Sequence, residues 1–272
     1  MYYFGKSKYY GSQRQPNFLT IEDCVLDALI KKDYIKNIKE SGFEASSRTD
    51  RFVSARGACF TFISDKKPIL MEINSALPND IGVWAYANVP LNFRSRYNAI
   101  FRHYIYMDPT PLSIYQKTNP VNMELMLKAC NQLKGRHDFI NFSKKDKNEQ
   151  KTVRDMDQVE VSINKGYLIF QFKSRAFLRQ QVRRMVKKLL ELGNGEIEYE
   201  EFLKLLDPTQ IKSYQPANPK GLILWDIMFD NEIRIEEDKK SKERMEKFFL
   251  NNEIISGFKH QLFRLLQHYD FS

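Results

Sequence analysis

The chain has 272 residues, of which 42% are hydrophobic, so it is long enough to fold around a substantial core. No run of about 18 apolar residues occurs, so no transmembrane helix is expected, and the opening MYYFGKSKYY lacks the apolar stretch of a secretory signal. The net charge of +9 favours a polyanionic partner, most commonly nucleic acid, although ordinary solubilising charge is the alternative.

Cysteine and histidine are sparse and scattered. The three cysteines stand far apart and cannot all pair, which is typical of reduced thiols in a cytoplasmic protein. No cysteine–histidine spacing is typical of zinc, and no phosphate-binding glycine motif occurs. We therefore expect neither a metal nor a nucleotide cofactor.

The first part of the chain alternates short strands with polar turns. The apolar stripe that follows Thr20 predicts a helix, and Thr20 with Asp23 matches a capping box. Strict alternation in FRHYIYM predicts a strand with Arg102, Tyr104 and Tyr106 on one face. In chain order we expect strands within residues 1–10, 58–64, 83–90 and 101–107.

The second part begins after the prolines at 109 and 111. Two apolar runs flanking Asn164-Lys165-Gly166 predict a β-hairpin. The 3.6-residue period of FLRQQVRRMVKKLLELG predicts a long helix, with Arg184, Lys187 and Lys188 on its solvent side. The expected helices are 123–133, 177–192 and 199–206, the expected strands are 158–163, 167–172 and 221–229, and the charged tail from 231 is predicted to be helical.

These elements predict an α+β fold with a largely antiparallel mixed sheet built from two similar halves. We expect the helices to cover one face and leave the other face free for a ligand. The predicted organisation is an N-terminal half (1–108), a C-terminal half (109–230) and a charged helical extension (231–272).

Three features could carry chemistry. Arg48 and Asp50 lie in the polar run SSRTD, which alone is also typical of a solvated turn. Tyr104 shares a face with basic and aromatic residues, as in RNA-binding sheets, or packs in the core. Arg179 and Arg183 are four residues apart on one flank of the expected helix, where their stems alternatively cover the edge of the core.

Six segments in order resemble the tRNA pseudouridine synthase A family over roughly residues 9–230. SSRTDRFVSARG resembles its catalytic motif, and FLRQQVRRMV resembles its conserved helix. The others are YYGSQRQPNFLTIEDCVLDAL, LPNDIGVWAYANVPLNFRSRYNAIFRHYIY, GRHDFINFSKKD and NPKGLILWDIMF. Ser54 and Asn141 are variants of the archaeal and eukaryotic branches.

The resemblance implies an isomerase that converts uridine to pseudouridine in tRNA, at positions 38–40 of the anticodon stem-loop, without a cofactor. It implies that Asp50 is the catalytic carboxylate, that Arg183 pairs with it, and that Tyr104 stacks on the target base and can remove the C5 proton. The substrate-binding candidates are Arg14, Arg48, Lys144, Arg179 and Leu222. Lys145, Lys147 and Lys151 are further phosphate contacts, or part of a solvated lysine loop.

The resemblance also implies a homodimer that binds tRNA. Arg51 and Phe52 depart from the family pattern. The family usually has a small or basic residue at the first position and a glycine at the second. A glycine there suggests a backbone conformation that phenylalanine rarely adopts. The alternatives left open are a non-catalytic RNA-binding protein on the same fold and a synthase with another RNA target.

Overall fold

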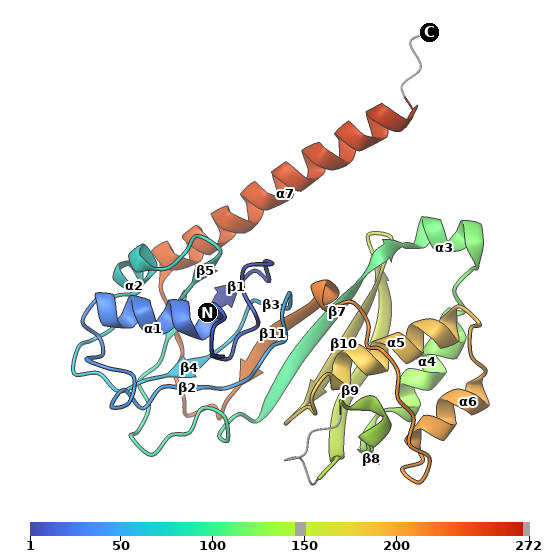
Figure 1. Cartoon of the computed structure of the whole chain (residues 1–272), viewed down its shortest axis with the longest axis horizontal. Coiled ribbons are helices and arrows are strands. Elements are labelled where there is room, and N and C mark those ends of the chain that lie inside the picture. Colours follow the sequence, from blue (N-terminus) through green and yellow to red (C-terminus); the bar gives the residue numbers. More distant parts are fainter. Residues whose placement is uncertain (145–150, 269–272) are drawn as a thin grey trace.

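The computed structural model describes residues 1–144 and 151–268, which form one large mixed sheet with helices packed against it (Figure 1). In these residues eight strands form the sheet in the order β5–β1–β3–β11–β7–β10–β9–β8. The strands of this sheet are β1 (Tyr2–Tyr3), β3 (Ser54–Ala55), β5 (Ile81–Gly82), β7 (Phe101–Pro111), β8 (Gly135–Asp138), β9 (Val153–Asn164), β10 (Tyr167–Ser174) and β11 (Leu222–Met228).

The sheet is antiparallel except where β3 runs parallel to β11. The prediction of an α+β fold with a largely antiparallel mixed sheet is therefore confirmed. The position of β11, between β3 and β7, joins the two ends of the sheet. The long β7 runs through the expected boundary at residue 108, and the division into halves stays a prediction.

Strands β9 and β10 form the expected hairpin. Their turn contains Lys165 at φ 47° and Gly166 at φ 80°, a left-handed pair that suits a tight hairpin turn. The alternation predicted for β7 is also present, because Arg102, Tyr104 and Tyr106 are all buried on one face of the strand.

The helices are α1 (Ile21–Lys31), α2 (Leu70–Ala76), α3 (Leu112–Thr118), α4 (Met123–Gln132), α5 (Gln181–Gly193), α6 (Tyr199–Leu203) and α7 (Lys239–His268). Short 3-10 turns are η1 (Ile140–Phe142), η2 (Lys204–Leu206) and η3 (Pro219–Gly221). The capping box of α1 is confirmed, because Thr20 and Asp23 bond each other's backbone. Helices α4 and α5 pack together, α4 on β9 and α5 on β7.

The candidate tyrosine lies on the helix-covered face of the sheet. Tyr104 faces the same side of β7 as its buried partners Phe172 and Leu224 on the neighbouring strands, because paired residues of antiparallel strands share a face. The side of the sheet on which the ligand binds stays a prediction.

Some local predictions are also wrong. The strands expected at 58–64 and 83–90 are reduced to β4 (Phe60–Thr61) and β6 (Ala85–Tyr86), which form separate two-stranded sheets with β2 (Glu44–Ala45) and β12 (Glu236–Glu237). Helix α5 begins four residues later than expected, because Gln180 adopts φ 61°. Arg179 thus precedes the helix, and Arg184 is buried beside the ring of Tyr214 instead of facing solvent.

The last helix, α7, projects away from the rest of the molecule (Figure 1). Its first part packs on the domain through buried Ser241 and Met245 and through the contact of Phe248 with Tyr2. Residues 249–267 are all exposed. Among the described residues, no helix combines the length and the apolar character needed to cross a bilayer.

Candidate active site

The polar run SSRTD is held against the body of the protein and is not a freely solvated turn. The Tyr3 hydroxyl bonds Oγ1 of Thr49 at 2.7 Å, and the Thr49 backbone N–H donates to Oγ of Ser12 at 2.8 Å. Gly11, at φ 99°, lies so close to this run that an added Cβ would come within 2.9 Å of the Thr49 carbonyl oxygen. The N-terminal segment therefore fixes the loop that carries Asp50.

A second anchor comes from β7. The Arg102 guanidinium is buried and donates through Nη2 to the carbonyl oxygens of Ser46, at 2.6 Å, and Arg96, at 2.8 Å. Burial lowers the pKa of Arg102, although the side chain remains a cation at neutral pH. Arg102 thus supports the loop backbone, a role that alternation along β7 alone does not reveal.

Asp50 and Arg183 are brought together from segments 133 residues apart. Nη1 of Arg183 donates to Oδ2 of Asp50 at 2.7 Å, while its Nε donates to the Ala217 carbonyl oxygen at 2.8 Å. The Arg183 side chain is 10% exposed and the Asp50 side chain 37%. Charge-assisted bonds of this length are shorter and stronger than bonds between neutral groups. Within residues 1–144 and 151–268, Oδ1 of Asp50 accepts no hydrogen bond.

Tyr104 contacts the same loop. Its hydroxyl bonds Oγ of Ser47 at 2.9 Å, and its ring meets the ring of Phe177 edge-on with centroids 5.1 Å apart. Burial raises the pKa of the Tyr104 phenol, so the hydroxyl stays protonated at neutral pH. Ser47 and Phe177 were not singled out in the sequence, and the only signal for Ser47 is its place in the polar run.

The other candidates divide into three groups. Leu222 is buried and pairs with Tyr106, on the face that carries Tyr104. Lys144 and Arg179 are exposed neighbours, joined by a bond from the Lys144 backbone N–H to the Arg179 carbonyl oxygen at 2.9 Å. Two more are exposed, namely Arg48 and Arg14, the latter paired with Asp23 at 2.8 Å.

The predicted lysine loop is only partly described. Lys151 is exposed, whereas Lys145 and Lys147 lie outside the described residues.

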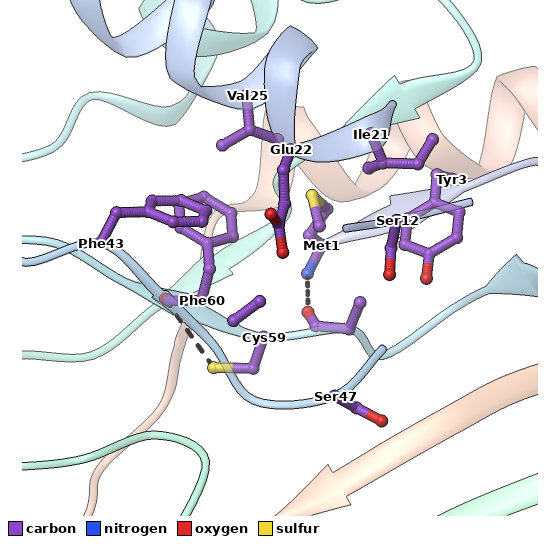
Figure 2. Close-up of a pocket in the computed structure, with 12 residues that line it drawn as sticks. Met1, Tyr3, Ser12, Ile21, Glu22, Val25, Phe43, Ser47, Cys59 and Phe60 are labelled. Atoms are coloured by element: carbon purple, nitrogen blue, oxygen red, sulfur yellow. Dashed lines mark hydrogen bonds between the residues drawn. The ribbon is translucent and has the colours of Figure 1, made fainter. Parts of the chain in front are cut away.

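A small cavity lies behind the loop, between α1 and the strands around β4 (Figure 2). Glu22, Ser12 and Ser47 are among its lining residues, together with apolar side chains such as Phe43. Its volume is about 20 Å³, room for on the order of one water molecule. A cavity of this size is too small for a nucleoside.

The chain is similar to known proteins of one family. Residues 129–230 match the family model described as tRNA pseudouridine synthase. The chain is 33% identical over 248 residues to "tRNA pseudouridine synthase A" of Methanothrix thermoacetophila, covering 90% of this chain and 87% of that protein.

Proteins of the same name from two other archaea give similar values. The identity is 31% over 245 residues for Methanosphaera stadtmanae (89% of this chain, 87% of the relative). It is 33% over 236 residues for Thermococcus kodakarensis (86% and 85%). With this identity sustained over most of both chains, the protein belongs to the tRNA pseudouridine synthase A family, a family of isomerases.

Proposed function

We propose that this protein isomerises uridine to pseudouridine in tRNA, with Asp50 as the catalytic carboxylate. The observation that carries the proposal is the pair formed by Asp50 and Arg183, in which a buried guanidinium holds one oxygen of a partly exposed carboxylate. Family membership supplies the reaction class, and the geometry supplies an acid suited to it.

The reaction requires that the bond between N1 of uracil and C1′ of ribose break and that a C5–C1′ bond form. In one route, Oδ1 of Asp50 attacks C1′ and uracil leaves with the N1–C1′ electron pair. The base then turns, C5 attacks C1′, and the carboxylate leaves. The C5 proton is lost and N1 gains a proton, so the product is an isomer of the substrate.

In a second route Asp50 acts as a base at the neighbouring ribose carbon. It removes the C2′ proton as uracil leaves, and returns it when the C5–C1′ bond forms. Both routes need a carboxylate with one free oxygen, and the charge-assisted bond from Arg183 engages Oδ2 only. Neither route needs a metal or a nucleotide.

Tyr104 is proposed to stack on the target base. Aromatic stacking stabilises a base that has left its helix. Removal of the C5 proton by Tyr104 is the less favoured role, because burial raises the pKa of the phenol and makes the phenolate scarce. Leu222 is proposed to wall the pocket, and Arg48 to hold the extruded nucleotide.

The proposed substrate region is the anticodon stem-loop, at positions 38–40. Arg14, Lys144 and Arg179 are exposed and are proposed to contact its phosphates. Several such contacts would make tRNA binding fall steeply with salt. A homodimer in the cytoplasm is part of the proposal, and sedimentation of the purified chain tests the dimer.

The decisive experiment is release of tritium from tRNA labelled at C5 of uridine. We expect release by the wild type and none by Asp50→Asn, an almost isosteric change that keeps an oxygen acceptor for Arg183. Both proteins should bind the tRNA. If neither protein releases tritium although both bind the tRNA, the chain is a non-catalytic RNA-binding protein instead. Mapping pseudouridines in cells without the gene tests the choice of tRNA positions.

A further inference from the structure

Aromatic and basic side chains form a stack that runs through the residue after Asp50. The rings of Phe18 and Tyr10 lie 4.2 Å apart, and Cζ of Arg51 lies 3.9 Å from the centroid of Tyr10. The same Cζ is 4.8 Å from the centroid of the Phe52 ring. Nζ of Lys220, a residue of η3, is 5.7 Å from the centroid of that ring. We call these five residues the aromatic–cation stack.

Phe52 is held in a conformation that its side chain disfavours. Its φ is 70°, in the left-handed region, which costs a residue other than glycine about 1–2 kcal/mol. Nearby backbone also restricts the loop, because a Cβ added to Gly5 would come within 2.3 Å of the Phe52 carbonyl group. A strained backbone retained beside a reactive group is typical of a functional position.

The Phe52 ring lines an open pocket of about 420 Å³, within the range of about 300–1,000 Å³ that is usual for ligand sites. Aromatic, basic and hydroxyl side chains line it, and none of the lining residues is acidic; the lining is Phe4, Gly5, Lys6, Ser7, Phe52, Ser54 and Lys220. This combination matches a nucleotide, since bases stack on aromatic rings and phosphates bind ammonium groups.

The two lysines of the pocket differ in their pairing. Nζ of Lys6 lies 3.1 Å from Oδ2 of Asp80, so much of its charge is compensated. Across residues 1–144 and 151–268, no carboxylate forms an ion pair with Lys220. Lys220 is exposed and lies beside the Phe52 ring, so it is the cation best placed for a phosphate.

The pocket is separate from the Asp50–Arg183 pair. Ser54 lines the pocket and precedes the buried Ala55. Ala55 pairs with Leu224, and Leu224 pairs with Tyr104, so Ala55 lies on the face of the sheet that carries Tyr104. Because side chains alternate along a strand, Ser54 points to the opposite face. Phe52 nevertheless follows Asp50 by only two residues, a span of about 7 Å of chain, so a nucleotide bound here lies near the target uridine.

We propose that this pocket binds an unpaired nucleotide of the RNA substrate next to the target, its base stacked on Phe52 and its phosphate at Lys220. This inference rests on the proposed function and adds a second RNA contact to it. Phe52 and Lys220 are then residues that determine substrate affinity and the choice of sequence context.

The test compares Phe52→Gly, Phe52→Tyr and Lys220→Gln with the wild type. Glycine adopts φ 70° without strain, so Phe52→Gly removes the ring and leaves the loop able to fold. Lys247→Gln, at an exposed lysine on α7, is the matched control. Binding of fluorescein-labelled tRNA is measured by anisotropy over a series of KCl concentrations, and tritium release gives kcat and KM.

We expect Phe52→Gly to weaken tRNA binding about tenfold, with KM raised, kcat nearly unchanged and the salt slope retained. Phe52→Tyr should bind like the wild type. Lys220→Gln should reduce the slope of log K against log salt by about 0.7–0.9, as loss of one phosphate contact requires. Lys247→Gln should change neither property.

Wild-type binding by Phe52→Gly, or an unchanged slope for Lys220→Gln, would overturn the inference. A fall in kcat with unchanged binding would also overturn it, because the ring would then only support the catalytic loop. The proposed function fails separately: if the wild type releases no tritium, the binding measurements still report on the pocket. If release is normal and Phe52→Gly binds normally, only the pocket assignment is lost.

Discussion

The Arg183 guanidinium is more deeply buried than the Asp50 carboxylate that it contacts at 2.7 Å, with 10% of its side chain exposed against 37%. The two partners therefore depend on the pair unequally. A buried cation that loses its partner cannot be rehydrated, whereas the partly exposed acid can take water instead. This asymmetry separates the effects of mutations on folding from those on catalysis.

Arg183→Met should fold and lose activity. Methionine has no charge to bury and fills part of the same space, and Asp50 remains partly hydrated. Without Nη1 the carboxylate loses the donor that orients it, so we expect turnover to fall at least about 100-fold, the loss typical of one well-placed electrostatic group. Single-turnover tritium release and circular dichroism measure the two properties, and unchanged turnover would refute the role of the pair.

The reverse mutation, Asp50→Ala, should destabilise the fold more than Arg183→Met. It leaves the buried guanidinium with the Ala217 carbonyl as an acceptor but without a counter-charge. We expect a loss of about 1–3 kcal/mol in the free energy of unfolding, measured in urea, and a smaller loss for Asp50→Asn. Equal stability of Asp50→Ala and the wild type would show that the guanidinium is not dependent on this acid.

Tyr104→Phe should lower kcat by about tenfold through loss of the hydrogen bond to Ser47, the equivalent of one bond of about 1.4 kcal/mol. Tyr104→Leu, which also removes the stacking ring, should cost more. Because burial raises the pKa of the phenol, the rate of the wild type should show no inflection from Tyr104 between about pH 7 and 9. An inflection there that disappears in Tyr104→Phe would instead identify the phenolate as a base.

Phe52→Gly should be more stable than Phe52→Ala by about 1 kcal/mol. Both changes remove the ring, so the comparison isolates the strain of a left-handed φ of 70° in a residue with a Cβ. Thermal unfolding of the two variants measures the difference. Equal melting temperatures would mean that the loop relaxes to another conformation in the alanine variant.

Asp80 should make the protein sensitive to acid. Burial alone would raise the pKa of Asp80, but bonds from Tyr9, Lys6 and Lys8 outweigh it and lower this pKa below its ordinary range. The stabilisation is therefore complete above the unfolded value of about 4 and is lost as the pH falls through the lower folded value.

Asp80→Asn should be less stable at pH 7 by roughly 1–3 kcal/mol and should lose less stability than the wild type between about pH 5 and 3. Urea titrations at several pH values measure this. Parallel pH dependence in both proteins would assign the acid sensitivity to other carboxylates.

Local periodicity predicted the regular elements well and the short strands poorly. The alternation of β7 and the hairpin at Lys165 and Gly166 are strong local signals. Strands of two residues, such as β4, carry no such signal because tertiary pairing alone defines them. The late start of α5 follows from the left-handed Gln180, which no apolar pattern encodes.

The site was predictable only in part. The family motifs predicted that Arg183 pairs with Asp50, as the structure shows. Helical periodicity alone left open that Arg183 covers the edge of the core, and it placed Arg184 in solvent. Tyr214, from an irregular segment, covers Arg184. The anchoring of the loop by Tyr3, Ser12 and Arg102 depends on segments far apart in the chain, so no local pattern could reveal it.

The place of β11 between β3 and β7 constrains how the protein is made. During translation, β3 and its preceding acid leave the ribosome long before β11, and the two halves of the sheet cannot join until residues 222–228 emerge. The nascent chain must carry an unpaired strand edge through most of its synthesis, a state prone to wrong pairing. Catalytic competence should therefore arise late and all at once, and a product truncated before β11 should be inactive even though it contains both Asp50 and Arg183.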